Sequence, residues 1–178
     1  MKNNNNNNNN FKGKHYLNNT TENKSIYYDS IIQQNISLHI TNIGQNLKET
    51  IENKLISDNE GKCVEQGYIK RGSIQLLTYS GSLLEGETVH YTVVFKCQCC
   101  FPVEGMLIDC VVKEITKAGI TAYYEHDTPS PIVVSIARDH SSQSSSFLEA
   151  KIGDKIVVKV IGQRFQKNDE HISVIAQI

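Results

Sequence analysis

One helical pattern stands in a chain whose other apolar patterns have the period of strands, and this contrast constrains the fold most. Ile43, Leu47, Ile51 and Leu55 recur every four residues, which places them on one face of a helix. A single helix of this kind has to bury its apolar face against a sheet. The sequence therefore predicts a small α+β domain.

Strand patterns lie on both sides of this helix. Thr41 or Asn42 is expected to cap the helix at its start, and Gly61 is expected to end it. Apolar and polar residues alternate before the helix, and strand-like segments separated by Gly-containing turns follow it, so we expect strands at 36–40, 62–70, 73–78 and 88–97. The N-terminal α+β domain is expected to span residues 31–101.

Residues 102–178 contain strand patterns, apart from the Ser-rich segment 141–148, which is expected to be a loop with a short helical turn. The strands are expected at 103–115, 120–124, 132–136, 153–162 and 171–178. Short strands with Gly turns in this number are typical of a small closed or partly open barrel of the OB type. In the second pattern, Ile120, Ala122 and Tyr124 share one face, whereas Thr121 and Tyr123 share the other.

Several strings in this order resemble one known family. GKCVEQGYIKRGSIQLLTYSGSLLEGETVHYTVVFKC follows the helix, FPVEGMLIDCVVKEITKAGI opens the barrel, and KIGDKIVVKVIGQRF with HISVIAQI closes it. Over residues 31–178 the chain resembles the stalk subunit of multisubunit RNA polymerases, which is the seventh subunit of eukaryotic RNA polymerase II and has an archaeal counterpart. The resemblance implies a noncatalytic subunit whose α+β domain docks on the polymerase core, and whose S1-type barrel contacts emerging RNA. It also implies a fourth-subunit-like partner along both domains, and no cofactor.

The barrel departs from the usual S1 pattern at the residues that stack bases. The matching positions are Ala118, Thr121 and Ser135, so the usual aromatic platform is largely missing. If Ile120 points into the barrel, Tyr123 points out and could stack a base of single-stranded RNA. The candidates for phosphate contacts are Lys113, Lys117, Arg138, Arg164 and His171.

The charge balance limits how strongly the barrel can bind nucleic acid. Residues 102–178 contain eight Lys and Arg against ten Asp and Glu, and RNA affinity depends heavily on phosphate neutralisation. We therefore expect weak, salt-sensitive binding at a local patch. In the N-terminal domain, the polar turns at 67–72 and near Gly61 are the expected core-docking loops, with Lys70 and Arg71 as the docking residues.

Neither a metal site nor a catalytic site is predicted. Cys97, Cys99 and Cys100 crowd one strand end, whereas a structural zinc site needs four well-spaced ligands. These cysteines are better explained as small buried residues at a domain junction. The sequence also lacks a phosphate-binding loop, a G-x-S-x-G motif and an H-E-x-x-H motif.

Residues 1–30 are polar and of low complexity, with eight consecutive Asn at 3–10, and they are expected to form a disordered tail. No apolar run approaches the ~20 residues of a membrane span, and no signal peptide is visible, so we expect an intracellular protein. The Asn-, Lys- and Ile-rich composition points to an AT-rich genome, that of a large DNA virus or of a protist. The protein would be nuclear in a cell, or found in the virion or host cytoplasm if the source is a large DNA virus.

Two other functions fit the same residues. One is a freestanding OB-fold RNA-binding or translation factor, and the other is an assembly scaffold that makes no RNA contact. Copurification with large polymerase subunits, rather than with ribosomal subunits or free messenger RNA, would distinguish the polymerase subunit from the first of these. Crosslinking of nascent RNA would distinguish it from the second.

Overall fold

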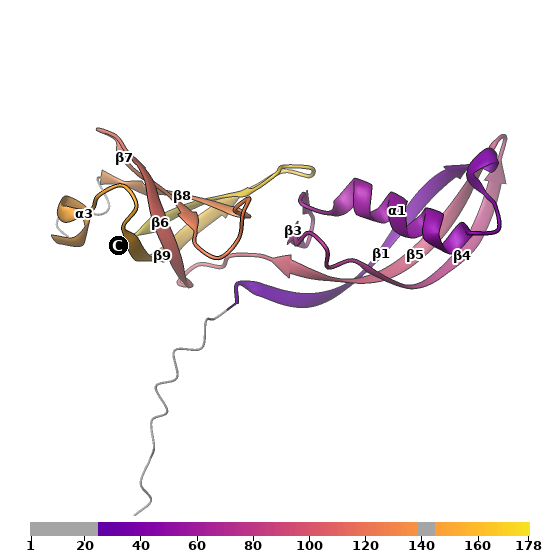
Figure 1. Cartoon of the computed structure of the whole chain (residues 1–178), viewed down its shortest axis with the longest axis horizontal. Helices are drawn as coiled ribbons and strands as arrows, with labels where there is room; N and C mark the ends of the chain where they lie inside the picture. Colours follow the sequence, from indigo (N-terminus) through magenta and orange to yellow (C-terminus); the bar gives the residue numbers. More distant parts are fainter. Residues whose placement is uncertain (1–24, 139–144) are drawn as a thin grey trace, which may run out of the picture.

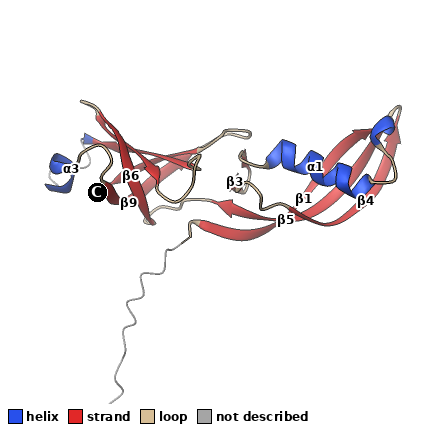
Figure 2. Cartoon of the chain, viewed as in Figure 1, coloured by secondary structure: helices blue, strands red, loops and turns tan. Residues whose placement is uncertain are grey.

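The structure is a computed structural model that describes residues 25–138 and 145–178. A five-stranded sheet carrying one long helix is followed by a closed barrel (Figures 1 and 2). The two parts lie end to end, so the described part of the molecule is elongated (Figure 1). Among the described residues, no helix is long and apolar enough to cross a membrane.

The sheet is built around its longest strands. Its elements in chain order are β1 (Tyr27–His39), the 3-10 turn η1 (Ile40–Asn42), α1 (Leu47–Asn59), β2 (Cys63–Val64), β3 (Gly67–Ile69), β4 (Gln75–Glu85) and β5 (Thr88–Cys100). β5 pairs with β1 along its whole length on one side, and with β4 and then β3 on the other. The predicted mixed α+β class is confirmed.

The helix begins later than the sequence indicates. The residues expected to cap it lie in η1, and the N-cap is Asn46, which makes no side-chain capping hydrogen bond. Ile51 and Leu55 are fully buried on the sheet, as predicted. Ile43 and Leu47 are only partly buried, so the prediction that all four apolar residues share one buried face is wrong at its start. The reason is that Ile43 precedes the helix and Leu47 lies in its first turn.

Several strands are longer than predicted, and β1 and β4 exceed the prediction most. β1 begins at Tyr27, inside the segment 1–30 whose composition indicates disorder, and residues 1–24 lie outside the described residues. β4 continues to Glu85 through two register shifts, across a stretch that the sequence indicates as a turn. A bulge inserts an extra residue and breaks the alternation of faces, which hides the strand from pattern reading.

The barrel closes in the order β10-β8-β7-β6-β9. Its elements are β6 (Leu107–Ile115), β7 (Gly119–Tyr124), β8 (Ile132–Ala137), the short helix α3 (Ser145–Glu149), β9 (Lys155–Arg164) and β10 (Ile172–Gln177). β10 and β8 are parallel and the other pairs are antiparallel. A closed barrel of five strands is compatible with the predicted OB fold.

Alternation along β7 is as predicted. Ile120, Ala122 and Tyr124 are buried in the barrel, whereas Thr121 and Tyr123 lie on its outer side and are half-buried. β7 starts at Gly119, where a Cβ atom would overlap the carbonyl oxygen of Ile136 on β8. Only glycine allows this close approach of the two backbones.

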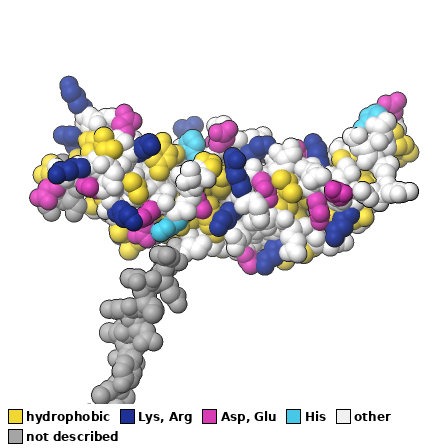
Figure 3. Space-filling model, viewed as in Figure 1, with side chains coloured by type: hydrophobic (Ala, Val, Ile, Leu, Met, Phe, Trp, Pro, Cys, Tyr) yellow, Lys and Arg dark blue, Asp and Glu magenta, His cyan; other side chains and the backbone are white. Residues whose placement is uncertain are grey.

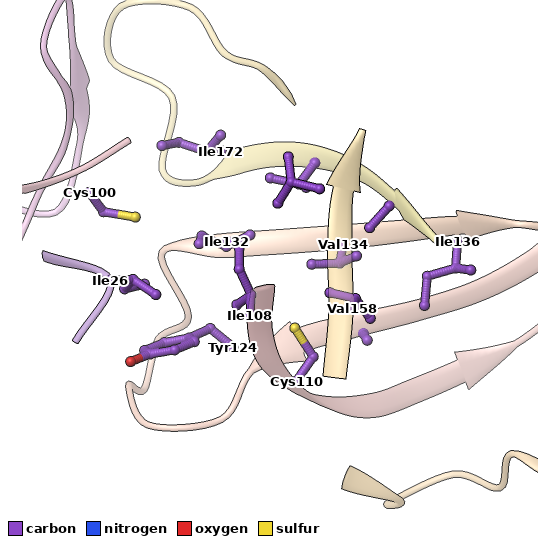
Figure 4. Packing of buried hydrophobic residues seen from close by; sticks show 14 of the residues in the cluster. Ile26, Cys100, Ile108, Cys110, Tyr124, Ile132, Val134, Ile136, Val158 and Ile172 are labelled. Atoms are coloured by element: carbon purple, nitrogen blue, oxygen red, sulfur yellow. The ribbon is translucent and has the colours of Figure 1, made fainter. Parts of the chain in front are cut away.

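The sheet fills the neighbouring end of the barrel. Ile26 and Cys100 pack against barrel residues such as Ile108 and Tyr124 (Figure 4), and Cys63 and Tyr68 belong to the same hydrophobic cluster. The turn between β9 and β10 reaches over to β2. There the N–H of Cys63 donates to the Asp169 carbonyl oxygen at 2.8 Å, and the N–H of Asn168 donates to the Cys63 carbonyl oxygen at 2.8 Å. Residues of the sheet therefore complete the barrel core, while a second hydrophobic cluster lies between the sheet and α1.

Candidate nucleic-acid interface

An open hollow of about 280 Å³ lies on the outside of the barrel, between β6, β7 and the loop that follows β7. Tyr123 lines it, and its neighbours across the strands are Val111 on β6 and Val133 on β8. Lys113 lines the same hollow and sits at the register shift of β6. The predicted stacking residue and one predicted phosphate contact are therefore brought together. Tyr123 is half-buried rather than fully exposed, so part of its ring is already covered by the protein.

Two carboxylates also line the hollow, and the sequence did not predict them as part of the site. Glu125 and Asp127 lie in its wall, and Glu125 forms an ion pair with Lys155 of β9. With Lys113 beside these acidic groups, the attraction for a phosphate is modest. Figure 3 agrees at a larger scale, because basic and acidic side chains are interspersed on the face shown rather than gathered in a basic band.

The other predicted RNA contacts are divided between the two ends of the barrel. Lys117 lies in the turn between β6 and β7, and Arg138 directly follows β8, where its N–H donates to the Ala118 carbonyl oxygen at 3.1 Å. The Arg138 guanidinium lies 5.8 Å from the centre of the Phe147 ring. Arg164 and His171 flank the turn between β9 and β10, at the end next to the sheet. These residues do not form one site with Tyr123.

None of the three positions matched to the base-contacting residues of an S1-type barrel is aromatic here, and two of them, Thr121 and Ser135, are polar. Thr121 of β7 pairs directly with Ser135 of β8. Tyr123 lies two residues further along the same face of β7, toward the sheet. The available aromatic ring is therefore displaced along the strand from the expected platform, and the hollow beside it is the part of this surface that could receive a base.

Lys70 and Arg71 lie beside a second open hollow, of about 470 Å³, at the side of the sheet. The ammonium group of Lys70 is 4.7 Å from the centre of the Tyr27 ring, and Arg71 makes a side-chain hydrogen bond with Tyr68. Asp29 in the same hollow is paired with Lys96 at 2.7 Å, which lowers the pKa of its carboxyl group. Both predicted docking residues therefore also contact side chains at the junction between sheet and barrel.

Tyr27 links the two parts of the molecule. Burial, and then a hydrogen bond from its hydroxyl group to Asp127, raise the pKa of Tyr27 far above its usual range. Asp127 lines the hollow beside Tyr123, and the Tyr27 ring lies beneath Lys70. No sequence pattern indicates this contact, because it depends on the packing of two segments that are far apart in the chain.

The cysteines divide between the two cores. Cys97 and Cys99 lie on the helix side of the sheet with their sulfur atoms 3.6 Å apart, whereas Cys100 faces the barrel. Burial raises the pKa of Cys100 to about 12. Hydrogen bonding between the pair raises the pKa of Cys97 and lowers that of Cys99. Within the described ranges, no three His, Cys, Asp or Glu side chains come together as a metal site.

No family model matches the chain, but several RNA polymerase subunits are similar to it. It is 28% identical over 99 residues to DNA-directed RNA polymerase II subunit 7 of Arabidopsis thaliana, and 25% identical over 99 residues to subunit RPB7 of Glycine max. Each match covers 54% of this chain and 56% of the plant protein, so the chain spans little more than half the length of these relatives.

A longer match is viral. The chain is 22% identical over 171 residues to a putative DNA-directed RNA polymerase subunit of Acanthamoeba polyphaga mimivirus, which covers 87% of this chain and 83% of the viral protein. The resemblance predicted from the sequence is confirmed: the chain is a homologue, at modest identity, of the subunit 7 proteins of RNA polymerase II and of a putative viral RNA polymerase subunit.

Proposed function

We propose that this chain is a noncatalytic subunit of a DNA-directed RNA polymerase, which docks on the core through its sheet and contacts nascent RNA with its barrel. The observation that carries the proposal is the match over most of the chain to a putative viral polymerase subunit, together with the matches to subunit 7 of plant RNA polymerase II. Two parts joined by a common core suit a rigid arm that holds the barrel at a fixed place relative to the docking surface.

The hollow beside Tyr123 supports the RNA contact. An aromatic ring at the edge of an open hollow can stack a base without selecting its identity, and such stacking contributes about 1–3 kcal/mol per base. Lys113 supplies a cation at the same place, while Glu125 and Asp127 keep the field weak. Weak binding is sufficient for a transcript that is already held by the polymerase, because tethering raises its effective concentration.

The hollow beside Lys70 and Arg71 supports docking on the core. It combines cationic side chains with the polar Ser73 and Gln98 on a rigid sheet, and loops on rigid scaffolds are common binding elements. A fourth-subunit-like partner is part of the same proposal. Because Lys70 and Arg71 also contact Tyr27 and Tyr68, a docking variant has to be checked for stability before its binding is interpreted.

A titration of fluorescent single-stranded RNA with the full chain tests the RNA contact. Tyr123→Ala should weaken binding about tenfold or more, because a loss of about 1.4 kcal/mol is a factor of ten. Tyr79→Ala is the matched control, since Tyr79 is an exposed tyrosine that packs against Tyr91 on the sheet. Equal affinity of the wild type and Tyr123→Ala would remove the stacking role. No binding by the wild type at low salt would favour a scaffold that serves protein partners only.

Copurification tests the docking and separates the alternatives. A tagged chain should recover the large polymerase subunits, whereas recovery of ribosomal subunits or free messenger RNA would favour a freestanding RNA-binding or translation factor. Replacing Lys70 and Arg71 together by Glu should reduce recovery of the polymerase while the melting temperature stays close to that of the wild type. Lys113→Glu, on the barrel, should leave recovery unchanged. Normal recovery of the double variant at raised salt would mean that docking uses another surface.

A further inference from the structure

β1 is an edge strand with only one partner among the described residues. It stands at the end of the sheet order and pairs with β5 from Tyr27 to His39 without a register shift. In an antiparallel pair, successive residues alternately direct their N–H and C=O groups toward the partner strand and away from it. Half of the backbone groups of β1 therefore point out of the sheet.

One hydrogen bond just beyond the end of β1 shows which residues of β1 direct their backbone groups out of the sheet. The N–H of Ile40 donates to the Glu87 carbonyl oxygen at 2.8 Å, so the even-numbered residues of β1 bond toward β5 and the odd-numbered ones point away. Two other bonds agree with this assignment. The N–H of Tyr27 donates to the Ser25 side chain rather than to β5, and the Gln98 carbonyl oxygen, on the far side of β5, accepts from the Lys70 N–H at 2.9 Å.

This outer edge is not protected against pairing. Asp29, Ile31, Gln33, Asn35 and Ser37 direct their backbone groups outward, and their side chains are exposed. Within the described residues no other backbone group bonds to them. Natural edge strands are usually blunted by proline, by lysine or by bulges. β1 contains neither proline nor lysine, its register is continuous, and its one acidic residue, Asp29, lies near one end and is paired with Lys96.

We propose that a second copy of this chain pairs with β1 along this edge, antiparallel, about a two-fold axis at Gln33. The outward residues are centred on Gln33, so each meets an outward residue of the other copy: Asp29 opposite Ser37, Ile31 opposite Asn35, and Gln33 opposite itself. No like charges face each other in this register, which would otherwise oppose pairing. The pairing covers Ile31, whose side chain is 67% exposed, and joins two sheets into one.

The contact has the symmetry that most soluble dimers use, because the same patch serves both copies. The proposal goes beyond the polymerase function and rests only on the geometry of β1. It does not use the hollows beside Tyr123 and Lys70, so a failure of RNA binding or of core docking leaves it unaffected. Conversely, the absence of a dimer would leave the proposed function standing.

Sedimentation equilibrium of the full chain, without other proteins, tests the proposal. The wild type should shift from monomer to dimer as its concentration rises. Gln33→Pro removes the outward N–H at the two-fold axis, and proline is tolerated on an edge strand where its N–H would face solvent. This variant should dimerise at least tenfold more weakly. Gln33→Thr, which keeps the N–H, should behave like the wild type.

Two further measurements keep the test decisive if Gln33→Pro does not fold. Ile31→Lys leaves the backbone intact and places a charge on the edge, so it should also weaken the dimer at least tenfold. In the wild type, amide hydrogen exchange at Ile31, Gln33 and Asn35 should slow as the dimer forms, while Gln34 is already protected by β5. A monomer up to millimolar concentration, or a dimer that ignores Ile31→Lys, would overturn the proposal.

Discussion

Gly67→Ala is the sharpest test of the junction between sheet and barrel. Gly67 opens β3 with a φ angle of +116°, and a Cβ atom there would overlap the carbonyl oxygen of Cys100 at the end of β5. Gly72 has a similarly unusual φ angle of +72°, but a Cβ atom added to it meets nothing within 4 Å. Alanine is therefore strained at both positions, at least as strongly at Gly67, whose φ angle lies further from the left-handed α region, and it meets a steric clash only at Gly67.

The expected difference follows from these two costs. A residue other than glycine pays about 1–2 kcal/mol in the left-handed α region, and this is the least that either variant has to pay. Overpacking adds about 1–3 kcal/mol at Gly67 only, because β3 has to move away from β5. For a chain of 150–250 residues, 1 kcal/mol lowers the melting temperature by about 2–4 °C. Gly67→Ala should thus melt about 2–12 °C below Gly72→Ala.

Thermal unfolding followed by circular dichroism measures this difference directly. Because Cys100 packs in the core that the sheet shares with the barrel, the loss should appear in a single transition rather than in one half of the molecule. Equal melting temperatures for Gly67→Ala and Gly72→Ala would refute the reasoning, since β3 would then be free to shift without disturbing the junction.

Two further outcomes are expected. Leu55→Ala should lower the free energy of unfolding by about 2–5 kcal/mol, because Leu55 is fully buried between α1 and the sheet, whereas Leu47→Ala should cost clearly less. Equal losses in chemical denaturation would show that the helix packs differently. Burial raises the thiol pKa values of Cys63, Cys100 and Cys110 from 9.0 to about 12, so the stability that these neutral thiols contribute is complete below about pH 9 and declines as the pH rises toward 12. Denaturation midpoints at about pH 8 and about pH 10.5 should reveal this decline, and Cys110→Ala should make it shallower; a flat profile would contradict it.

The sequence predicted those parts of the fold that depend on local alternation. The faces of β7 were correct, because a strand with a buried inner face repeats every second residue. Predictions from alternation were wrong where a bulge or a turn interrupts the two-residue repeat of a strand. Register shifts carry β4 past Gly81, and η1 occupies the place where the helix was expected to begin. The early residues of β1 were missed because Asp29 and Ser30 interrupt the apolar pattern.

The candidate site was predictable only in part, for the same physical reason. Tyr123 and Lys113 come from two strands joined by a short turn, so their approach follows from the hairpin alone. The contact of Tyr27 with Asp127 joins segments from the two halves of the chain, and no local pattern encodes it. The separation of Arg164 from Lys117 likewise follows from how the barrel closes, which places the two turns at opposite ends.

The filling of the barrel by the sheet bears on how such a protein can be divided or recombined. The end of the barrel core next to the sheet is closed by Ile26, Tyr68 and Cys100. These residues belong to the sheet domain, in or next to its strands. A truncated barrel that begins at Phe101 would lack these residues, and Ile108 and its neighbours would be exposed to water. A chimera that combined the sheet domain of this chain with the barrel of a relative would have to keep these residues complementary in shape to the end of the barrel. The sheet domain and the barrel are therefore expected to be exchanged together, although the sequence suggests two separate domains.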